Sequence, residues 1–353
     1  MNAPNQSHDP VSGATTSRPG RNCWSCALIW SIGLAMVVSI GLAAWAATQA
    51  LRPAPRPLRV AINPWPGYEF ASLARAKGFF EQEGVDVRLL ELSGLGDCVR
   101  AFEREQVDGF FGTVTEVLRS RDQSRRDAQV VMVADYSDGA DVILARPDIA
   151  TVAELRGKRI GIETGSLTAF ILARALEEAG LGWLDVRTVH MAAMDMAAAM
   201  AERKVDAVVT YPPLSLEIVK CGHGREIFST RAIPGEVVDV LAFDESCLKT
   251  RGDEVRGFLR AFHRAQEYAA AHPAESMAIM AAREGITPEE FAAALTNGVR
   301  MLGQADQARF LGREGSLRGV VVATDRILRQ IGQVSDPQAA RGVLATFGED
   351  RGD

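Results

Sequence analysis

Short apolar runs with the pattern of β-strands are separated along most of this chain by longer segments with helical spacing. The first strand is expected over Leu58–Asn63, and a helix over Phe70–Glu83 follows it after a short turn. The alternation continues to a strand at Val237–Phe243, after which the pattern is mostly helical. Strands that alternate with helices are typical of βαβ units and a largely parallel sheet, so we expect an α/β protein.

The strand and helix patterns form two successive sets, and a chain of this length is expected to build more than one hydrophobic core. Short extended segments near residues 139–147 and 234–243 would carry the chain between the two sets twice. The predicted organisation is therefore a lobe one made of residues 57–143 and 237–340, and a lobe two made of residues 147–235, joined by a two-strand hinge.

The N-terminal part of the chain predicts export from the cytoplasm. Residues 1–21 are expected to form a disordered cytoplasmic tail that contains Arg18 and Arg21. Residues 22–51 carry no charge and exceed the roughly 20 residues that span a bilayer. They are either a transmembrane anchor or a signal peptide, because Ala44-Trp45-Ala46 offers a small-x-small cleavage site. Both alternatives place the rest of the chain at the extracytoplasmic or periplasmic face of the membrane.

Charge and cysteine content exclude several classes of function. The formal net charge of −6 comes without a basic patch, so no nucleic-acid partner is expected. Beyond the apolar segment lie Cys98, Cys221 and Cys247, whose spacing fits neither a zinc site nor a CxxC redox pair. One disulfide is compatible with export, although buried free thiols are the favoured interpretation. We expect neither a metal nor a cofactor.

The turn after the first strand carries an unusual concentration of polar and aromatic side chains, Asn63-Pro64-Trp65-Pro66-Gly67-Tyr68-Glu69. Two prolines and a glycine end the strand sharply, because proline lacks the N–H that a strand needs and glycine permits unusual dihedral angles. Ligands of α/β sheets lie outside the carboxyl ends of the strands. The turn therefore predicts a binding site.

Several motifs in a fixed order resemble one family, the periplasmic substrate-binding proteins of ABC importers in the nitrate/sulfonate/taurine group. That group includes relatives of the thiamine-pyrimidine-precursor proteins. The resemblance runs from about Leu58 to Leu328 and rests on six segments, 63–69, 74–80, 84–87, 107–113, 155–161 and 205–211. It implies the type II periplasmic-binding-protein fold, in which two α/β lobes close on a ligand by hinge motion.

In that fold, loops after the strands of lobe one would contact the ligand, and Asn63, Trp65, Tyr68 and Thr113 occupy such positions. Asn63 can donate and accept hydrogen bonds, and the two rings can stack on a ligand. Trp65 and Tyr68 could instead plug the turn, and Thr113 could be a plain helix N-cap. Asp135 and Tyr136 belong to an acidic segment that could bind an amino-bearing ligand or could form a polar turn.

The opposite wall, in lobe two, would come from Glu163, Thr164, Gly165 and Ser166 at a helix start and from Tyr211 after a strand. Thr164–Ser166 resemble the hydroxyl-rich anion cradle of family members that bind oxyanions. Glu163 does not fit a simple anion, and it could grip an amine or an aminopyrimidine N–H instead. Tyr211 could alternatively cap the core.

The resemblance implies an extracytoplasmic solute-binding component of an ABC importer. It would capture a small organic solute, sulfonate- or taurine-like or an amino-bearing heterocycle, and deliver it to a permease powered by a separate ATPase subunit. One alternative is an enzyme of the thiamine-pyrimidine-synthesis type on the same fold; another is a membrane-anchored ligand sensor. The chain contains no GxSxG, HExxH or P-loop motif, and its histidines are scattered, so we expect no catalysis.

Overall fold

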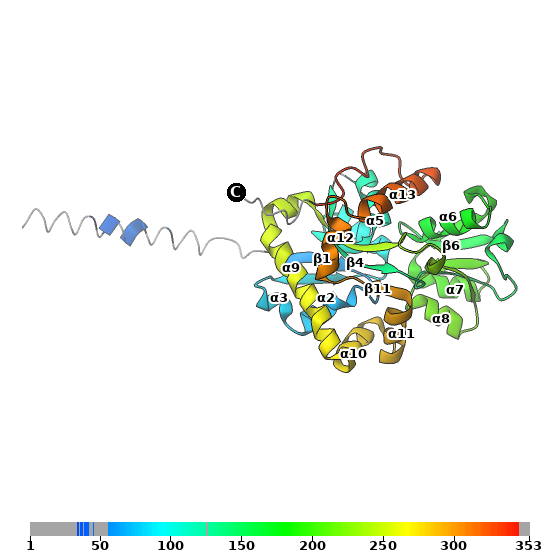
Figure 1. Cartoon of the computed structure of the whole chain (residues 1–353), viewed down its shortest axis with the longest axis horizontal. Coiled ribbons are helices and arrows are strands. Elements are labelled where there is room, and N and C mark those ends of the chain that lie inside the picture. The colour runs from blue at the N-terminus through cyan, green and yellow to red at the C-terminus, as the bar shows by residue number, and fades with distance from the viewer. Residues whose placement is uncertain are drawn as a thin grey trace, which may run out of the picture. The chain divides into compact units, whose positions relative to one another are not determined.

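The computed structural model describes residues 56–124 and 126–345, together with residues 34, 36, 37, 39–41 and 45. The chain divides into two units, Met1–Arg56 and Pro57–Asp353, and both sheets of the fold belong to the second unit (Figure 1). The predicted tail 1–21 and most of the predicted anchor or signal segment 22–51 lie outside the described residues. Among the residues that are described, no helix is both long enough and apolar enough to cross a bilayer.

A six-stranded sheet forms the centre of lobe one, with the strand order β11-β4-β10-β3-β1-β2. Strands β1, β2 and β3 are parallel, whereas β10 pairs antiparallel with both β3 and β4. The strands are β1 Leu58–Ile62, β2 Val87–Glu91, β3 Gly109–Thr113, β4 Ala128–Ser137, β10 Val238–Asp244 and β11 Val299–Met301.

A five-stranded sheet forms the centre of lobe two, with the order β7-β6-β8-β5-β9. Here β6, β7 and β8 are parallel, and β5 pairs antiparallel with β8 and β9. The strands are β5 Val142–Ala145, β6 Arg159–Glu163, β7 Arg187–Met191, β8 Ala207–Thr210 and β9 Arg225–Ser229.

Helices pack around both sheets (Figure 1). Those that follow the strands of lobe one are α2 Glu69–Ala76, α3 Phe79–Gln82, α4 Leu95–Glu103 and α5 Val114–Gln123. Lobe two contributes α6 Thr168–Glu178, α7 Met196–Ala201 and α8 Leu214–Lys220. The C-terminal part returns to lobe one as α9 Glu245–Ala271, α10 Pro273–Glu284, α11 Pro288–Gly298, α12 Gln307–Leu311 and α13 Leu317–Gln330. Short 3₁₀ helices lie at 152–155, 183–185, 193–195, 230–232 and 304–306.

Helix α9 begins earlier than its sequence pattern predicts. The pattern predicts a start at Asp253, but the structure has helix from Glu245, with non-helical dihedral angles at Arg251 (φ −130°, ψ 25°). The predicted helix is therefore the longer part after this kink. Asp244 caps the start, because its side chain accepts a hydrogen bond from the backbone N–H of Ser246 at 3.0 Å.

The chain crosses between the sheets twice, and each crossing ends in an antiparallel strand. The first crossing leads from β4 to β5 across residues 138–141, and the second leads from β9 to β10. The predicted lobe bounds (57–143 plus 237–340, and 147–235) stay predictions. The acidic segment from Asp135 is a turn only at its end, because β4 continues to Ser137 by pairing with β10 and β11.

Aromatic side chains fill the space between the six-stranded sheet and helix α9. Phe258 of α9 is fully buried and stacks on Phe80, with ring centroids 4.8 Å apart. The same ring lies 6.2 Å from Phe111 of β3 and 6.4 Å from Phe243 of β10. This cluster joins the C-terminal helices to the strands that carry the site.

We predict that Phe258→Ala lowers the free energy of unfolding by about 3–5 kcal/mol, because it removes a ring from a close-packed core. Val322→Ala is the control, since Val322 is 68% exposed on α13 and its truncation should change stability by about 0.5 kcal/mol or less. Urea unfolding of both variants measures the difference. Equal effects would show that the Phe258 cluster does not hold lobe one together.

Candidate ligand-binding site

The strand ends that face lobe two bring several polar side chains of lobe one together. Asn63 follows β1 and Thr113 ends β3. Asp239 of β10 pairs in register with Thr113 on one side and with Asp135 of β4 on the other. Because β10 runs antiparallel to its neighbours, its start lies at the edge where they end, and Asp239 reaches the cleft.

Two aromatic residues of the turn after β1 donate hydrogen bonds to these carboxylates. The Trp65 indole N–H donates to Asp135, with Nε1–Oδ1 at 3.1 Å, and the Tyr68 hydroxyl donates to Asp239 Oδ1. Gly67 lies between them, and a Cβ there would stand 1.9 Å from Asp135 Oδ2. Trp65 and Tyr68 are thus buried, and their polar atoms hold the carboxyl groups of Asp135 and Asp239.

Burial sets the protonation of the acidic cluster, which consists of Asp135, Asp141 and Asp239. Burial raises the pKa of Asp135 and of Asp141 to about 7. It also raises the pKa of Asp239 well above its usual range, and the neighbouring Asp135 charge adds to that rise. Near neutral pH the cluster therefore holds protons that a solvated carboxyl would have lost.

Two carboxylate oxygens in the cluster have no hydrogen-bond partner within the protein, Asp239 Oδ2 and Asp141 Oδ2. Asp141 is 2% exposed and lies one residue before β5, where its backbone carbonyl accepts a hydrogen bond from the N–H of Thr230 at 3.0 Å. A buried polar atom without a partner costs free energy, so these two oxygens mark where an N–H or O–H donor is missing from the protein itself.

Lobe two closes the site with Tyr211, which follows β8. The Tyr211 ring meets Trp65 of lobe one edge-on, with ring centroids 6.1 Å apart. Its hydroxyl donates a hydrogen bond to Glu163 Oε2 at 2.9 Å. Glu163 is 4% exposed, and its Oε1 accepts a hydrogen bond from the backbone N–H of Gly96 in lobe one at 3.0 Å.

The two lobes enclose a small cavity of about 10 Å³. This volume is about the minimum that holds one water molecule. The residues around it come from both lobes, and none of these nine described residues is a lysine or an arginine: Asn63, Trp65, Tyr68, Leu95, Thr113, Asp141, Leu167, Tyr211 and Asp239. In this arrangement the lobes must separate before a solute can enter.

The predicted site residues fall into three groups in this geometry. The cavity is lined by Asn63, Trp65, Tyr68, Thr113 and Tyr211. Asp135 and Glu163 are buried next to it, behind Trp65 and Tyr211 respectively. Four further residues are not among the lining residues: Tyr136, Thr164, Gly165 and Ser166. A ligand contact for any of these residues stays a prediction.

Thr113 is the N-cap of α5, which was the plainer of its two predicted roles. Its hydroxyl oxygen accepts a hydrogen bond from the N–H of Thr115 at 3.1 Å and donates to Glu116 Oε2 at 2.6 Å. The Glu116 carboxyl also accepts from the Thr113 N–H, which completes a capping box. Burial raises the pKa of Glu116 to about 7.

Sequence reasoning missed Asp239 and did not assign Asp141 to the ligand. A signal for Asp239 was available, because one carboxylate interrupts an otherwise apolar predicted strand at 237–243. A charged residue in a buried strand needs a partner or a function. For Asp141 the missing information was three-dimensional, since only the antiparallel pairing of β5 places it beside Tyr211.

Cysteine and histidine residues do not build a reactive centre in the described part of the chain. None of the three cysteines there forms a disulfide, and the prediction of buried thiols holds for Cys98 and Cys247, whereas Cys221 is exposed. Burial raises the pKa of Cys98 well above its usual value, so this residue is a thiol rather than a thiolate. Likewise, among the described residues no group of His, Cys, Asp and Glu side chains could hold a metal ion.

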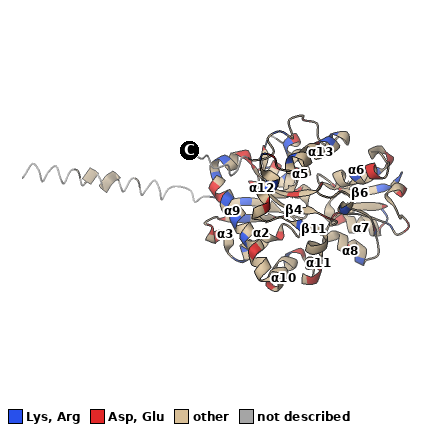
Figure 2. Cartoon of the chain, viewed as in Figure 1, with Lys and Arg blue, Asp and Glu red and all other residues tan. Residues whose placement is uncertain are grey.

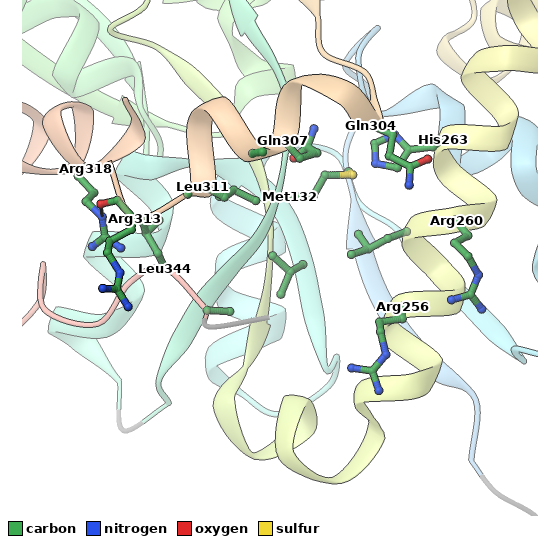
Figure 3. A pocket seen from close by; sticks show the side chains of 15 residues that line it. Met132, Arg256, Arg260, His263, Gln304, Gln307, Leu311, Arg313, Arg318 and Leu344 are labelled. Atoms are coloured by element: carbon green, nitrogen blue, oxygen red, sulfur yellow. Dashed lines mark hydrogen bonds between the residues drawn. The ribbon is translucent and has the colours of Figure 1, made fainter. Parts of the chain in front are cut away.

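A larger concavity of about 580 Å³ lies elsewhere, at the edge of β4 in lobe one (Figure 3). Arg256 and Arg260 of α9 stand on one side of it, and Arg313 and Arg318 stand on the other. The residues that line it come from β4, from α9 and from residues 304–345, and none of them belongs to the five-stranded sheet. Along the ribbon of residues 57–345, Lys and Arg residues are interspersed with Asp and Glu residues (Figure 2).

Two lobes with inserted antiparallel strands and a cleft between them define a periplasmic-binding-protein fold. The chain belongs to the NMT1/THI5-like family, whose sequence profile matches residues 66–276. The resemblance inferred from the sequence and the fold class are thereby confirmed.

Among sequences, a binding protein of Brucella abortus (strain 2308) is 23% identical over 291 residues, which cover 80% of this chain and 88% of the relative. Among solved structures, the alkanesulfonate-binding protein SsuA from Xanthomonas axonopodis pv. citri, bound to MOPS, superposes with a TM-score of 0.66. It is 18% identical, and the match covers 80% of this chain and 96% of SsuA.

An enzyme shares the same fold. The desulfurization enzyme DSZB superposes with a TM-score of 0.61 at 19% identity, and the match covers 82% of this chain and 96% of the enzyme. At sequence identities this low, the superpositions establish the fold only. The chemistry must be argued from the residues of the site.

We predict that the unfolding free energy of the protein falls as pH rises from about 4 to about 7. The buried carboxyls hold protons in this window that the unfolded chain releases, so the folded state loses stability as pH rises. Asp239→Asn should flatten this slope and stabilise the protein by about 1–2 kcal/mol at pH 8, because it removes a buried acid. Urea unfolding between pH 4 and 8 measures both effects.

The matched control is Asp253→Asn, since the Asp253 side chain is 95% exposed on α9. This variant should keep the slope of the parent protein. A slope that Asp239→Asn leaves unchanged would show that the buried cluster does not govern the pH dependence.

Proposed function

We propose that this protein is the extracytoplasmic solute-binding component of an ABC importer, and that its solute is a small organic molecule with an amino group or an amino-bearing ring. The observation that carries the proposal is the pair of partnerless oxygens, Asp141 Oδ2 and Asp239 Oδ2, on residues that line the cavity between the lobes. A protonated amine or an aromatic amino group supplies the N–H donors that these oxygens lack.

Aromatic rings and charge support the same class of solute. Trp65, Tyr68 and Tyr211 line the cavity, and such rings attract cations over their faces and stack on planar heterocycles. The lining residues include no lysine or arginine that could pair with a sulfonate or nitrate group, and such a group would be repelled by Asp141 and Asp239 wherever these are ionised. Of the two solute classes predicted from the sequence, the amino-bearing heterocycle therefore fits better than a simple sulfonate.

In this proposal the solute enters between separated lobes, and contacts from both lobes then favour closure. The closed protein delivers the solute to a membrane permease whose ATPase is a separate subunit. The family membership and the fold of the SsuA relative support this role. An N-terminal anchor over residues 22–51 would keep the protein at high local concentration near the permease.

The enzyme alternative rests on the fold that the chain shares with DSZB. An enzyme needs a reacting group at the cavity, and the lining residues include neither cysteine nor histidine. Cys98 is buried as a thiol, 4.0 Å from Asn63 Oδ1. The site therefore favours binding over catalysis, and absence of turnover of a bound solute is the observation that separates the two.

Calorimetric titration of the purified full chain with aminopyrimidines, taurine, alkanesulfonates and nitrate tests the solute class. We expect binding of the amino-bearing heterocycles, weaker binding of taurine because of its sulfonate, and no binding of nitrate. A protein that binds only the simple anions would contradict the proposed role of Asp141 and Asp239.

A second prediction concerns pH and the charge of Asp141. Because its pKa is about 7, the affinity for a cationic solute should fall as pH drops below 7, by at most about tenfold per pH unit. Asp141→Asn should weaken binding at pH 8 by about tenfold or more and should remove most of the pH dependence. Titrations of both proteins at pH 5.5, 6.5 and 8 measure this, with Asp253→Asn as the control. A parent protein whose affinity is the same at all three pH values would contradict it.

A further inference from the structure

The Glu163 carboxylate joins the two lobes instead of facing the cavity. It ends β6 in lobe two, and it is absent from the residues that line the cavity. One of its oxygens accepts from the Tyr211 hydroxyl of its own lobe, and the other accepts from the Gly96 backbone N–H of lobe one. Opening the cleft must break the bond to Gly96 and leave the bond to Tyr211 intact.

The partner of Glu163 in lobe one is the start of helix α4. Gly96 is the second residue of this nine-residue helix, where backbone N–H groups lack partners inside the helix. The partial positive charge of a helix N-terminus stabilises a carboxylate placed there. A second contact lies beside the first, because the Arg100 guanidinium donates to the Thr164 carbonyl with Nη1–O at 3.4 Å.

Two glycines make this close approach possible. A Cβ at Gly94 would stand 2.3 Å from Glu163 Oε1, and a Cβ at Gly96 would stand 2.1 Å from the Thr164 carbonyl oxygen. The clash at Gly96 is with backbone, which cannot swing aside as a long side chain could. Any larger residue at Gly96 therefore holds the lobes apart.

We propose that Glu163 is a closure latch: its hydrogen bond to the Gly96 N–H favours the closed arrangement of the lobes independently of the solute. Glu163 is then a positioning residue that raises solute affinity without touching solute. Affinity scales with the fraction of protein in the binding-competent state, so a latch acts on every solute of the site equally. Its effect on affinity, though not its effect on closure, rests on the proposed solute-binding function.

Two variants test the latch from opposite lobes, in the purified full chain and without any solute. Glu163→Ala removes the acceptor, and Gly96→Ala introduces the backbone clash while replacing glycine in a helix by a better helix former. We expect both to speed hydrogen exchange of the backbone amide at position 96 by about tenfold and to increase the radius of gyration in X-ray scattering. Glu163→Gln keeps an acceptor oxygen and should show a smaller change.

Gly319→Ala is the matched control, because Gly319 is an exposed helical glycine of α13 with no atom within 4 Å of a Cβ built there. It should match the parent protein in both measurements. A Gly96 amide that exchanges freely in the parent protein overturns the latch. So does a backbone amide at position 96 that stays protected in both Glu163→Ala and Gly96→Ala.

Solute titration then separates this proposal from the proposed function. If the latch exists, Glu163→Ala and Gly96→Ala weaken the binding of every bound solute by a similar factor. A loss of solute affinity in Glu163→Ala with unchanged Gly96 exchange shows instead that Glu163 contacts the solute, and it overturns the latch. If no compound of the panel binds, the proposed solute class fails, while the exchange measurement still decides the latch.

Discussion

The site depends on one topological constraint: each strand by which the chain enters the other sheet pairs antiparallel to its neighbours. Strand β5 enters lobe two beside β8, and strand β10 re-enters lobe one between β3 and β4. An antiparallel strand starts at the edge where its parallel neighbours end, and that edge faces the cleft. Asp141 and Asp239 stand at these two starts, so the residues proposed to contact the solute also border the two crossings of the chain between the sheets.

Placing carboxylates at those positions is costly, and the fold offsets only part of the cost. The Tyr68 hydroxyl and the Trp65 indole satisfy one side of the Asp135 and Asp239 pair. Protonation lowers the remaining cost, which is why the pKa of each carboxyl is raised. If the proposed function is right, the oxygens left without partners represent stability given up in favour of binding, a compromise that is common at functional sites.

The sequence was sufficient for the parallel part of the architecture. Parallel strands end at one edge, so the turn at 63–69, Thr113 and Tyr211 could be placed at the cleft from their positions after strands, together with the fold that the family resemblance implies. Asp239 could not be placed at the cleft, because the local sequence pattern does not reveal the direction of a strand. The start of a strand lies at the cleft only if that strand runs antiparallel to its neighbours. The partner of Glu163 was also beyond reach, since Gly96 is 67 residues away in sequence and contributes only its backbone.

The two proposals give different tasks to Glu163 and to the pair Asp141 and Asp239. Both carboxyl oxygens of Glu163 accept hydrogen bonds from the protein. One donor is the Tyr211 hydroxyl of the same lobe, and the other is the Gly96 N–H at the N-terminus of α4 in the other lobe. Asp141 and Asp239 keep oxygens for which the protein supplies no donor. In these proposals, closure energy and solute recognition therefore reside on separate side chains. A chain of this fold could change its solute through the two crossover strands while keeping the same contact between its lobes.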